Sequence, residues 1–273
     1  MSFYGVPEGR RVTMRDLAEA TRRGEKWPMI TAYDALTARI FDEAGIPALL
    51  VGDSAAMVVY GHDSTIPVTV DELVPLVRAV VRGASRALVI ADLPFGSYQE
   101  SPAQAMRTAA TFMKDGGAQA VKLEGGAPML PHVELLASAG VPVICHLGLT
   151  PQSVNLLGGY RVQGRGEAGE TLLRDAKAME AAGACAMVLE AVPAELASRV
   201  SELLTIPTIG IGAGAGTDAQ VIVWQDIVGL TPPPHPRFVA PYADVRTVLH
   251  DAVAAWGADV ASGAYPAPEQ SYQ

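Results

Sequence analysis

The stretch ALVIADLPFGSYQESPAQAMRTAATFMKDGGAQAVKLE, residues 87–124, contains two short apolar runs separated by a helical segment. The runs are Ala87–Ala91 and Ala120–Leu123, and Ser101 suits the N-cap of a helix over Pro102–Lys114. Neither run alternates between apolar and polar residues, which is typical of strands buried on both faces of a parallel sheet. The stretch therefore predicts a β-α-β unit.

The same alternation continues in both directions along the chain. Further apolar runs, read as strands, are Met29–Ala32, Ala48–Gly52, Val141–Cys145, Ala186–Leu189 and Thr208–Ile211. Helical patterns lie between them, mostly closed by glycine: Ala35–Ala44, Val70–Arg82, Pro131–Ser138, Glu170–Ala182 and Pro193–Leu203. We expect the eighth strand between Gln220 and Leu230. This order predicts a (β/α)8 TIM barrel, a fold that suits a chain of 273 residues.

A C-terminal extension follows the predicted barrel. The Pro-rich stretch Thr231–Pro236 leads to a last helix over Val245–Ser262. No repeat or low-complexity block divides the chain, so we expect one domain over residues 1–273, with 231–273 as C-terminal helix and tail. This helix has an apolar side that suits packing on a neighbouring subunit, formed by Val248, Val253, Trp256 and Val260.

Composition excludes several classes of protein. Hydrophobic residues make up 49% of the chain and charged residues 18%, which argues against disorder. The net charge of −9 argues against binding to nucleic acid or to an anionic membrane surface. The start, MSFYGVPEGRR, lacks the apolar segment of a signal peptide, and no apolar stretch reaches spanning length, so we expect a cytoplasmic protein. Cys145 and Cys185 are expected to be buried thiols without a disulfide.

Charged and polar residues fall where predicted strands end. The C-terminal ends of all strands in a (β/α)8 barrel meet at one face, and that face carries the active site. The residues concerned are therefore expected to converge on one pocket, and they are Asp53, Asp92, Lys122, Glu124, His146 and Glu190.

Each of these residues also has a purely structural interpretation. Asp53 can be a turn residue or a helix cap. Lys122 and Glu124 point to the same side of a strand and can form a structural ion pair. His146 can be a hydrogen-bonded core histidine. Glu190 ends a very apolar strand, where a single carboxylate has few structural roles.

Clustered carboxylates suit a hard cation such as Mg²⁺, which takes one or two carboxylates together with water and substrate oxygens. No cysteine and histidine spacing indicates zinc. A 2-oxo acid offers a carboxylate and a ketone oxygen to such a cation, which would stabilise its enolate. Lys122 would offset the remaining carboxylate charge. The Gly-rich segment Gly210–Gly216 is compatible with a phosphate site or with close backbone packing alone.

Several motifs resemble the ketopantoate hydroxymethyltransferase family. They run in family order from Thr31 to Gly214, and VGDS, ADLPF, KLEGG and HLGLTPQS are together highly specific. The full set of matching stretches is TAYDALTARIFDEAG, LLVGDSAAMVVYGHDSTIPVT, ADLPFGSY, AVKLEGG, HLGLTPQSVNLLGGYRVQGR, VLEAVPAELA and IPTIGIGAG.

The resemblance implies a cytoplasmic enzyme of pantothenate biosynthesis. The implied reaction transfers a hydroxymethyl group from 5,10-methylenetetrahydrofolate to 3-methyl-2-oxobutanoate, giving 2-dehydropantoate. The implied Mg²⁺ site consists of Asp53, Asp92 and Glu124, and the implied general base is Glu190. Substrate contacts are implied for Asp53, Ser54, Asp92, Lys122 and His146. Similar proteins form large homo-oligomers, commonly decamers.

Two segments limit the resemblance. Many family members have His where Gln225 stands in Trp224-Gln225-Asp226, so no catalytic role is expected for Gln225. The region beyond Leu230 matches loosely.

The loop Tyr160–Gly169 is a candidate lid over the site.

Two other functions compete with this one. A related Mg²⁺-dependent barrel could cleave or rearrange a C–C or P–C bond without folate, as in the isocitrate lyase and phosphoenolpyruvate mutase group. A barrel that only binds a metal and an oxo acid would not need Glu190 as a base.

Overall fold

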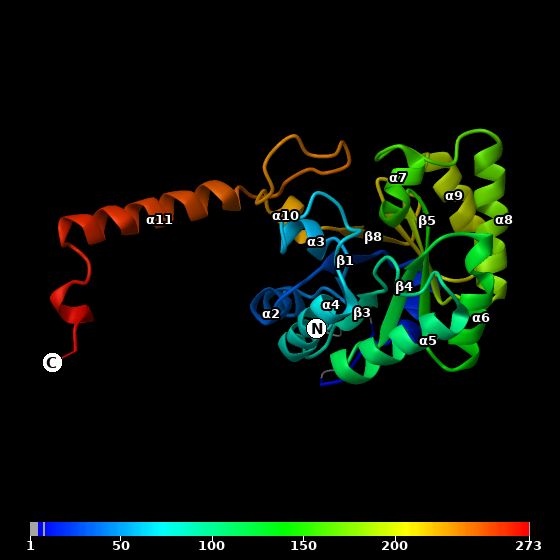
Figure 1. Ribbon diagram of the computed structural model, residues 1–273, viewed down its shortest axis with the longest axis horizontal. Coiled ribbons are helices and arrows are strands. Elements are labelled where there is room, and N and C mark those ends of the chain that lie inside the picture. The colour runs from blue at the N-terminus through cyan, green and yellow to red at the C-terminus, as the bar shows by residue number, and fades with distance from the viewer. Residues whose placement is uncertain (1–4, 8, 273) are drawn as a thin grey trace. The chain divides into compact units, whose positions relative to one another are not determined.

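The computed structural model describes residues 5–7 and 9–272 and contains a closed barrel of eight parallel strands. Every strand pairs with the next one along the chain, and β8 pairs with β1 (Figure 1). The predicted TIM barrel is confirmed. The strands are β1 (Trp27–Thr31), β2 (Ala48–Val51), β3 (Leu88–Asp92), β4 (Ala120–Glu124), β5 (Val143–Gly148), β6 (Ala186–Glu190), β7 (Thr208–Ile211) and β8 (Ala219–Ile222).

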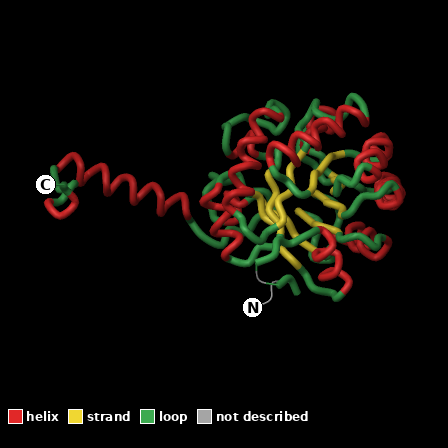
Figure 2. Tube along the Cα trace, turned by 90° about the horizontal axis from the view of Figure 1, so that it is seen from below, coloured by secondary structure: helices red, strands yellow, loops and turns green. Residues whose placement is uncertain are grey.

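Helices surround the ring of strands, as Figure 2 shows. The α-helices of this part are α1 (Met14–Arg22), α2 (Ala35–Glu43), α3 (Ala55–Val58), α4 (Val70–Gly83), α5 (Pro102–Thr111), α6 (Leu130–Ser138), α7 (Val154–Leu157), α8 (Glu167–Ala181) and α9 (Ala194–Leu203). Shorter helical turns are η1 (Phe112–Gly116), η2 (Ala127–Met129) and η3 (Pro151–Ser153).

Most boundaries differ from the expected ones by a residue or two, and β5 covers Val143–Gly148 rather than Val141–Cys145. The α-helix that begins at Pro102 ends at Thr111, and the chain continues through Gly116 as a π-helical turn. Helix α8 begins at Glu167 rather than at Glu170, and its N-cap is Gly166 with φ of 60°. Strand β8 begins at Ala219, one residue before the range in which we expected it.

The chain forms two compact units, Met1–Val223 and Trp224–Gln273. The first contains the barrel. The second contains α10 (Trp224–Ile227), α11 (Val245–Ser262) and η4 (Pro268–Gln270), and α11 buries none of its side chains. The bounds of α11 match the predicted helix. The assignment of one domain with an extension from residue 231 stays a prediction.

The barrel interior is apolar along most of its length and polar at one end. Alternate residues of each strand point inwards, so Leu88 and Ile90 of β3 belong to the same buried cluster as Ala120 of β4 and Ile144 of β5. Continuing that alternation places Asp92, two residues beyond Ile90, on the inner side. The polar residues therefore end columns of inward-facing apolar side chains.

Helix α1 closes the N-terminal end of the barrel. Leu17 and Ala20 of α1 lie in the buried cluster with Trp27 and Met29 of β1. The indole Nε1 of Trp27 donates a hydrogen bond to Thr21 of α1 at 3.1 Å. Sequence patterns did not indicate this helix, which precedes the first strand. The barrel is thus filled at one end and carries its polar groups at the other.

Both cysteines are free; Cys145 is buried, as expected, whereas Cys185 is half-buried. Burial is the main reason that the pKa of each thiol is raised above its ordinary value. In the described part of the chain, no helix combines the length and the apolar character needed to cross a membrane.

Candidate active site

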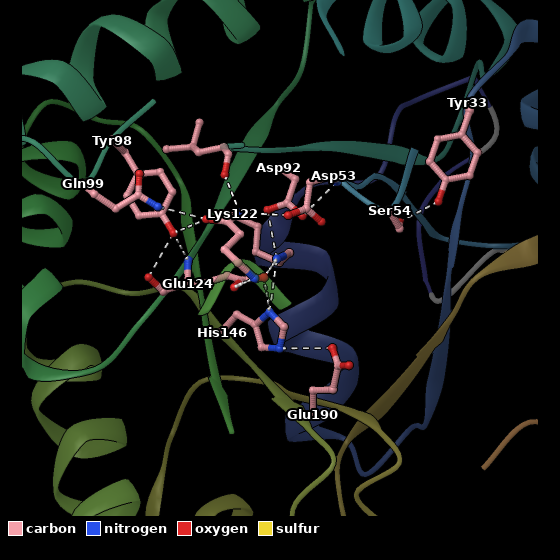
Figure 3. A network of polar contacts seen from close by, with 12 residues as sticks. Tyr33, Asp53, Ser54, Asp92, Tyr98, Gln99, Lys122, Glu124, His146 and Glu190 are labelled. Carbon is pink, nitrogen blue, oxygen red and sulfur yellow. Dashed lines mark hydrogen bonds and ion pairs between the residues drawn. The ribbon is translucent and has the colours of Figure 1, made fainter. Parts of the chain in front are cut away.

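The strand register brings five residues together at the C-terminal ends of the strands. Asp92 is paired in register with Lys122, and Glu124 with His146. Their exposed fractions, and that of Asp53, are 5% or less. We call this set the strand-end cluster: Asp53, Asp92, Lys122, Glu124 and His146. Figure 3 shows these side chains pointing towards one another.

Lys122 lies at the centre of the strand-end cluster. Its Nζ is 2.9 Å from Oδ1 of Asp92, 3.8 Å from Oε1 of Glu124 and 3.2 Å from Nδ1 of His146. Burial lowers the pKa of Lys122, but attraction to the surrounding carboxylates more than reverses this and raises the pKa above its ordinary value. The ammonium group therefore stays charged. The structural ion pair with Glu124 is present, but the closer partner is Asp92.

Asp53 and Asp92 form a pair of neighbouring carboxylates. The backbone N–H of Asp53 donates to Oδ2 of Asp92 at 3.3 Å. Burial raises the pKa of both aspartates, and the neighbouring negative charges raise that of Asp53 further. Lys122 acts in the opposite direction on both. Two buried carboxylates this close repel one another, so the pair favours an additional positive charge.

Ser54 and Tyr33 form a separate hydroxyl pair. Their oxygens are 2.7 Å apart, and Tyr33 is buried. Figure 3 shows Tyr33 and Ser54 as a linked pair drawn apart from Lys122 and His146. Burial is the main reason that the pKa of Tyr33 is raised. Tyr33 was not identified from the sequence, although it lies in the quoted TAYDALTARIFDEAG stretch.

Glu190 lies at the edge of the cluster, and His146 connects it to the buried carboxylates. Nε2 of His146 is 3.3 Å from Oε2 of Glu190, whose side chain is 17% exposed. Nδ1 of the same ring is 3.4 Å from Oε1 of Glu124. Burial and Lys122 lower the pKa of His146, but the carboxylates on its two sides raise it to about 9. Glu190 is therefore more exposed to solvent than the strand-end cluster beside it.

The backbone around Glu190 is tightly constrained. Ala191 has a φ of 46°, a left-handed conformation that is unusual for alanine. Two hydrogen bonds hold it, from its N–H to the carbonyl of Ile211 and from the N–H of Gln163 to its own carbonyl. A Cβ at Gly148 would lie 2.3 Å from the carbonyl oxygen of Glu190, so only glycine fits beside this strand end.

Gln152 and Tyr98 complete the site and were not singled out from the sequence. Gln152 is buried and donates from Nε2 to Oδ2 of Asp53 at 2.9 Å. The hydroxyl of Tyr98 is 2.8 Å from Oε1 of Gln152. Both residues lie in stretches of family resemblance, ADLPFGSY and HLGLTPQS, and that was the only available signal.

The Gly-rich segment after β7 packs closely against α9. A Cβ at Gly216 would lie 2.1 Å from Oγ of Ser198, and one at Gly214 would lie 2.5 Å from Cβ of Ala194. These distances favour the close-packing interpretation of this segment.

A cavity of 380 Å³ lies in the second unit. None of its lining residues belongs to the strand-end cluster; they are Leu230, Arg246, Thr247, Leu249 and His250.

The donor set of the cluster fits a hard divalent cation. Asp53, Asp92 and Glu124 bring three buried carboxylates, and Lys122 and His146 are the two cationic side chains beside them. Buried charge without compensation is costly, so the cluster favours a further cation. Within residues 5–7 and 9–272, no three His, Cys, Asp or Glu side chains form a ready-made metal cage. Mg²⁺ does not require one, because it usually takes one or two carboxylates and keeps water or substrate oxygens.

The barrel and its C-terminal strand-end cluster define a TIM-barrel enzyme with a compact, charged site. The sequence profile described as ketopantoate hydroxymethyltransferase matches residues 11–268. A Frankia casuarinae protein named 3-methyl-2-oxobutanoate hydroxymethyltransferase is 65% identical over 275 residues, covering 98% of this chain and 93% of the relative. A protein of the same name from Thermobifida fusca is 61% identical, covering 99% of this chain and 97% of the relative. The chain belongs to the ketopantoate hydroxymethyltransferase family and is a transferase enzyme.

Solved structures of other enzymes share the fold. A phosphonopyruvate hydrolase in complex with oxalate and Mg²⁺ has a TM-score of 0.61 and 13% sequence identity, covering 95% of this chain and 93% of that one. A 2,3-dimethylmalate lyase has a TM-score of 0.59 and 18% identity, covering 94% and 92%. At this identity the likeness establishes the barrel architecture alone.

Proposed function

We propose that this enzyme transfers a hydroxymethyl group from 5,10-methylenetetrahydrofolate to 3-methyl-2-oxobutanoate and so forms 2-dehydropantoate in pantothenate biosynthesis. The family membership supports the reaction. Within the site, the main support for this reaction is the partly exposed carboxylate of Glu190. His146 connects it to the buried strand-end cluster, which favours a cation. The carboxylate suits abstraction of a proton next to a ketone, and a cation would stabilise the enolate that forms.

Asp53 and Asp92 would hold Mg²⁺, with Glu124 beside them. When bound, the cation would accept the ketone and carboxylate oxygens of the oxo acid and lower the cost of the enolate. Ser54 and Lys122 would contact the oxo acid, and Lys122 would offset the negative charge that remains. Its 2.9 Å contact with Asp92 keeps the ammonium group within the cluster.

Glu190 would then remove the proton from C3 of the oxo acid. Nε2 of His146 lies 3.3 Å from Glu190 and would orient its carboxylate to take this proton. The carbanion at C3 forms a bond to the methylene carbon of the folate or of its iminium form. Water supplies the hydroxyl group, the bond between that carbon and the folate nitrogen breaks, and the nitrogen takes up a proton as tetrahydrofolate leaves.

We also propose that the protein is cytoplasmic and that it acts as a homo-oligomer, with a decamer as the expected state. The apolar side of α11 supports assembly, because Val248, Val253 and Trp256 are 65%, 63% and 54% exposed. Light scattering measures the mass of the particle. A monomer at micromolar concentration would contradict this assignment.

The reaction is tested by following the C3 proton of 3-methyl-2-oxobutanoate by NMR in D₂O. Enzyme and Mg²⁺ should exchange the proton, and added methylenetetrahydrofolate should then give 2-dehydropantoate. Exchange without product would retain the enolisation and reject folate as the donor, as in a related lyase or mutase barrel. Folded enzyme that shows neither reaction would contradict the proposal.

A further inference from the structure

Gln152 joins two carboxylates of the strand-end cluster, although it comes from a loop rather than from a strand. It lies in η3, the helical turn that follows β5, and it is 4% exposed. Its side-chain amide donates to Oδ2 of Asp53, and its backbone N–H donates to Oε2 of Glu124 at 3.0 Å. One residue therefore occupies one oxygen of each carboxylate.

The orientation of the Gln152 amide is fixed on both sides. Its Nε2 donates to Asp53 and, at 2.9 Å, to the carbonyl oxygen of Leu93. Its Oε1 accepts from the hydroxyl of Tyr98 and from Nε2 of Gln99, at 2.8 and 3.0 Å. A flipped amide would place its N–H groups against donors and its oxygen against acceptors. The four contacts thus allow a single orientation.

Tyr98 extends this arrangement to the end of β4. Its hydroxyl accepts a hydrogen bond from the backbone N–H of Glu124 at 3.1 Å while it faces Gln152. The backbone and the carboxylate of Glu124 are consequently held by two connected residues. Rotation about χ2 of an aspartate is soft, so the contact from Gln152 is what selects the position of Oδ2 in Asp53.

The remaining oxygens of the two carboxylates differ in their surroundings. Oε1 of Glu124 lies near Lys122 and His146. Among the hydrogen bonds of the described residues, none reaches Oδ1 of Asp53. The geometry leaves that oxygen as the one that Asp53 can offer to a cation.

We propose that Gln152 is a positioning residue for the divalent-cation site, because its side-chain amide fixes which oxygen of Asp53 is presented to the cation. This inference rests on the proposed function, since the cation is part of that proposal. Partners that orient metal ligands typically contribute 10- to 100-fold in metal affinity. The same range is expected here.

The test is the affinity of the purified enzyme for Mn²⁺, measured by electron paramagnetic resonance without substrates. Q152M keeps the size of the side chain and the backbone N–H but removes both donors and both acceptors. We expect its Kd for Mn²⁺ to rise about 10- to 100-fold. We also expect the KM for the cation to rise similarly, with kcat largely recovered at saturating cation.

Q119M is the matched control at the other end of the barrel. Gln119 precedes β4, and its Oε1 accepts a hydrogen bond from the backbone N–H of Val89. This variant loses a part-buried amide in the same way, so its melting temperature should fall, but its Mn²⁺ affinity should equal that of the unaltered enzyme. A purely structural role for Gln152 would make both variants behave alike.

The outcomes separate the two proposals. Weaker Mn²⁺ binding in Q152M alone supports the positioning role. Equal binding in the unaltered enzyme and Q152M overturns the role of Gln152 and leaves the cation site standing. Absence of Mn²⁺ binding to the unaltered enzyme overturns the cation site and this inference with it. If Q152M does not fold, Y98F removes one donor to the same amide, and unchanged Mn²⁺ affinity in that variant overturns the inference.

Discussion

The imidazole of His146 lies between two carboxylates, with Nε2 3.3 Å from Glu190 and Nδ1 3.4 Å from Glu124. Glu124 is buried, whereas the side chain of Glu190 is 17% exposed. His146 therefore connects the part of the site that suits a cation to the part that suits a base. The first two predictions follow from this connection.

Replacing Glu190 by Gln should abolish exchange of the C3 proton without loss of Mn²⁺ or oxo-acid binding. The amide has nearly the shape of the carboxylate but cannot accept the proton, so a loss of about 10²- to 10⁴-fold is expected. NMR in D₂O measures the exchange, and calorimetry measures binding. E195Q, on an exposed position of α9, serves as the control. Unimpaired exchange in E190Q would remove Glu190 as the base.

Replacing His146 by Asn should slow the same exchange, although Glu190 itself is not substituted. The shorter side chain cannot contact both carboxylates, and misplacement of a catalytic group by about 1 Å can cost about 10²-fold. The exchange rate at saturating oxo acid is the quantity to compare. A rate equal to that of the unaltered enzyme would restore the interpretation of His146 as a core histidine.

Replacing Asp92 by Ala should weaken the metal-dependent binding of the oxo acid. The change also removes the closest partner of buried Lys122, and breaking a buried pair typically costs about 3–5 kcal/mol. Thermal unfolding must therefore be measured beside calorimetric titration with Mg²⁺ present. Unchanged oxo-acid binding in a folded D92A enzyme would argue against Asp92 as a metal ligand.

Replacing Leu17 by Ala should destabilise the enzyme without changing its chemistry. Leu17 is fully buried at the N-terminal end of the barrel, and such truncations cost about 2–5 kcal/mol. L36A is the matched control, because Leu36 is 73% exposed. Urea unfolding gives the stability, and kcat below the transition should be unaffected. A large fall in kcat for L17A would show that the two ends of the barrel are coupled.

Stability should depend on Asp16 at neutral pH and lose that dependence in acid. The hydrogen bond from Arg10 is the main cause that lowers the pKa of Asp16 from 3.8 to about 2. Asp16 also caps α1 together with Thr13. A folded-state pKa below the unfolded value stabilises the fold above about pH 4 and ceases to do so as the pH falls towards 2.

D16N should therefore lower the free energy of unfolding by about 1 kcal/mol at pH 7 and by less at pH 3. Urea unfolding at both values checks this. An equal difference at both pH values would mean that the charge of Asp16 contributes nothing.

The strands and the strand-end residues could be predicted because both follow from local patterns. Continuous apolar runs marked the strands, and the residues that closed those runs, such as Asp92 and His146, lie in the cluster. Gln152 could not be found this way. Its contact with Asp53 spans 99 positions and depends on the path of the loop after β5. No local pattern encodes such a path.

Other differences have equally physical origins. Helix α1 lies outside the strand–helix alternation, so its role depends on the apolar end of the barrel that it covers. The left-handed φ of Ala191 is held by hydrogen bonds to Ile211 and Gln163, which are distant in sequence. Propensity alone would have assigned neither feature.

Helix α1 and the apolar side chains beneath it fill the N-terminal end of the barrel, so that end offers no polar site. The groups proposed to meet the substrate all lie at the opposite end of the barrel, beside Glu190. Substitutions near α1 can then change the thermal stability of the enzyme without changing the site around Glu190. The two properties could therefore be engineered separately.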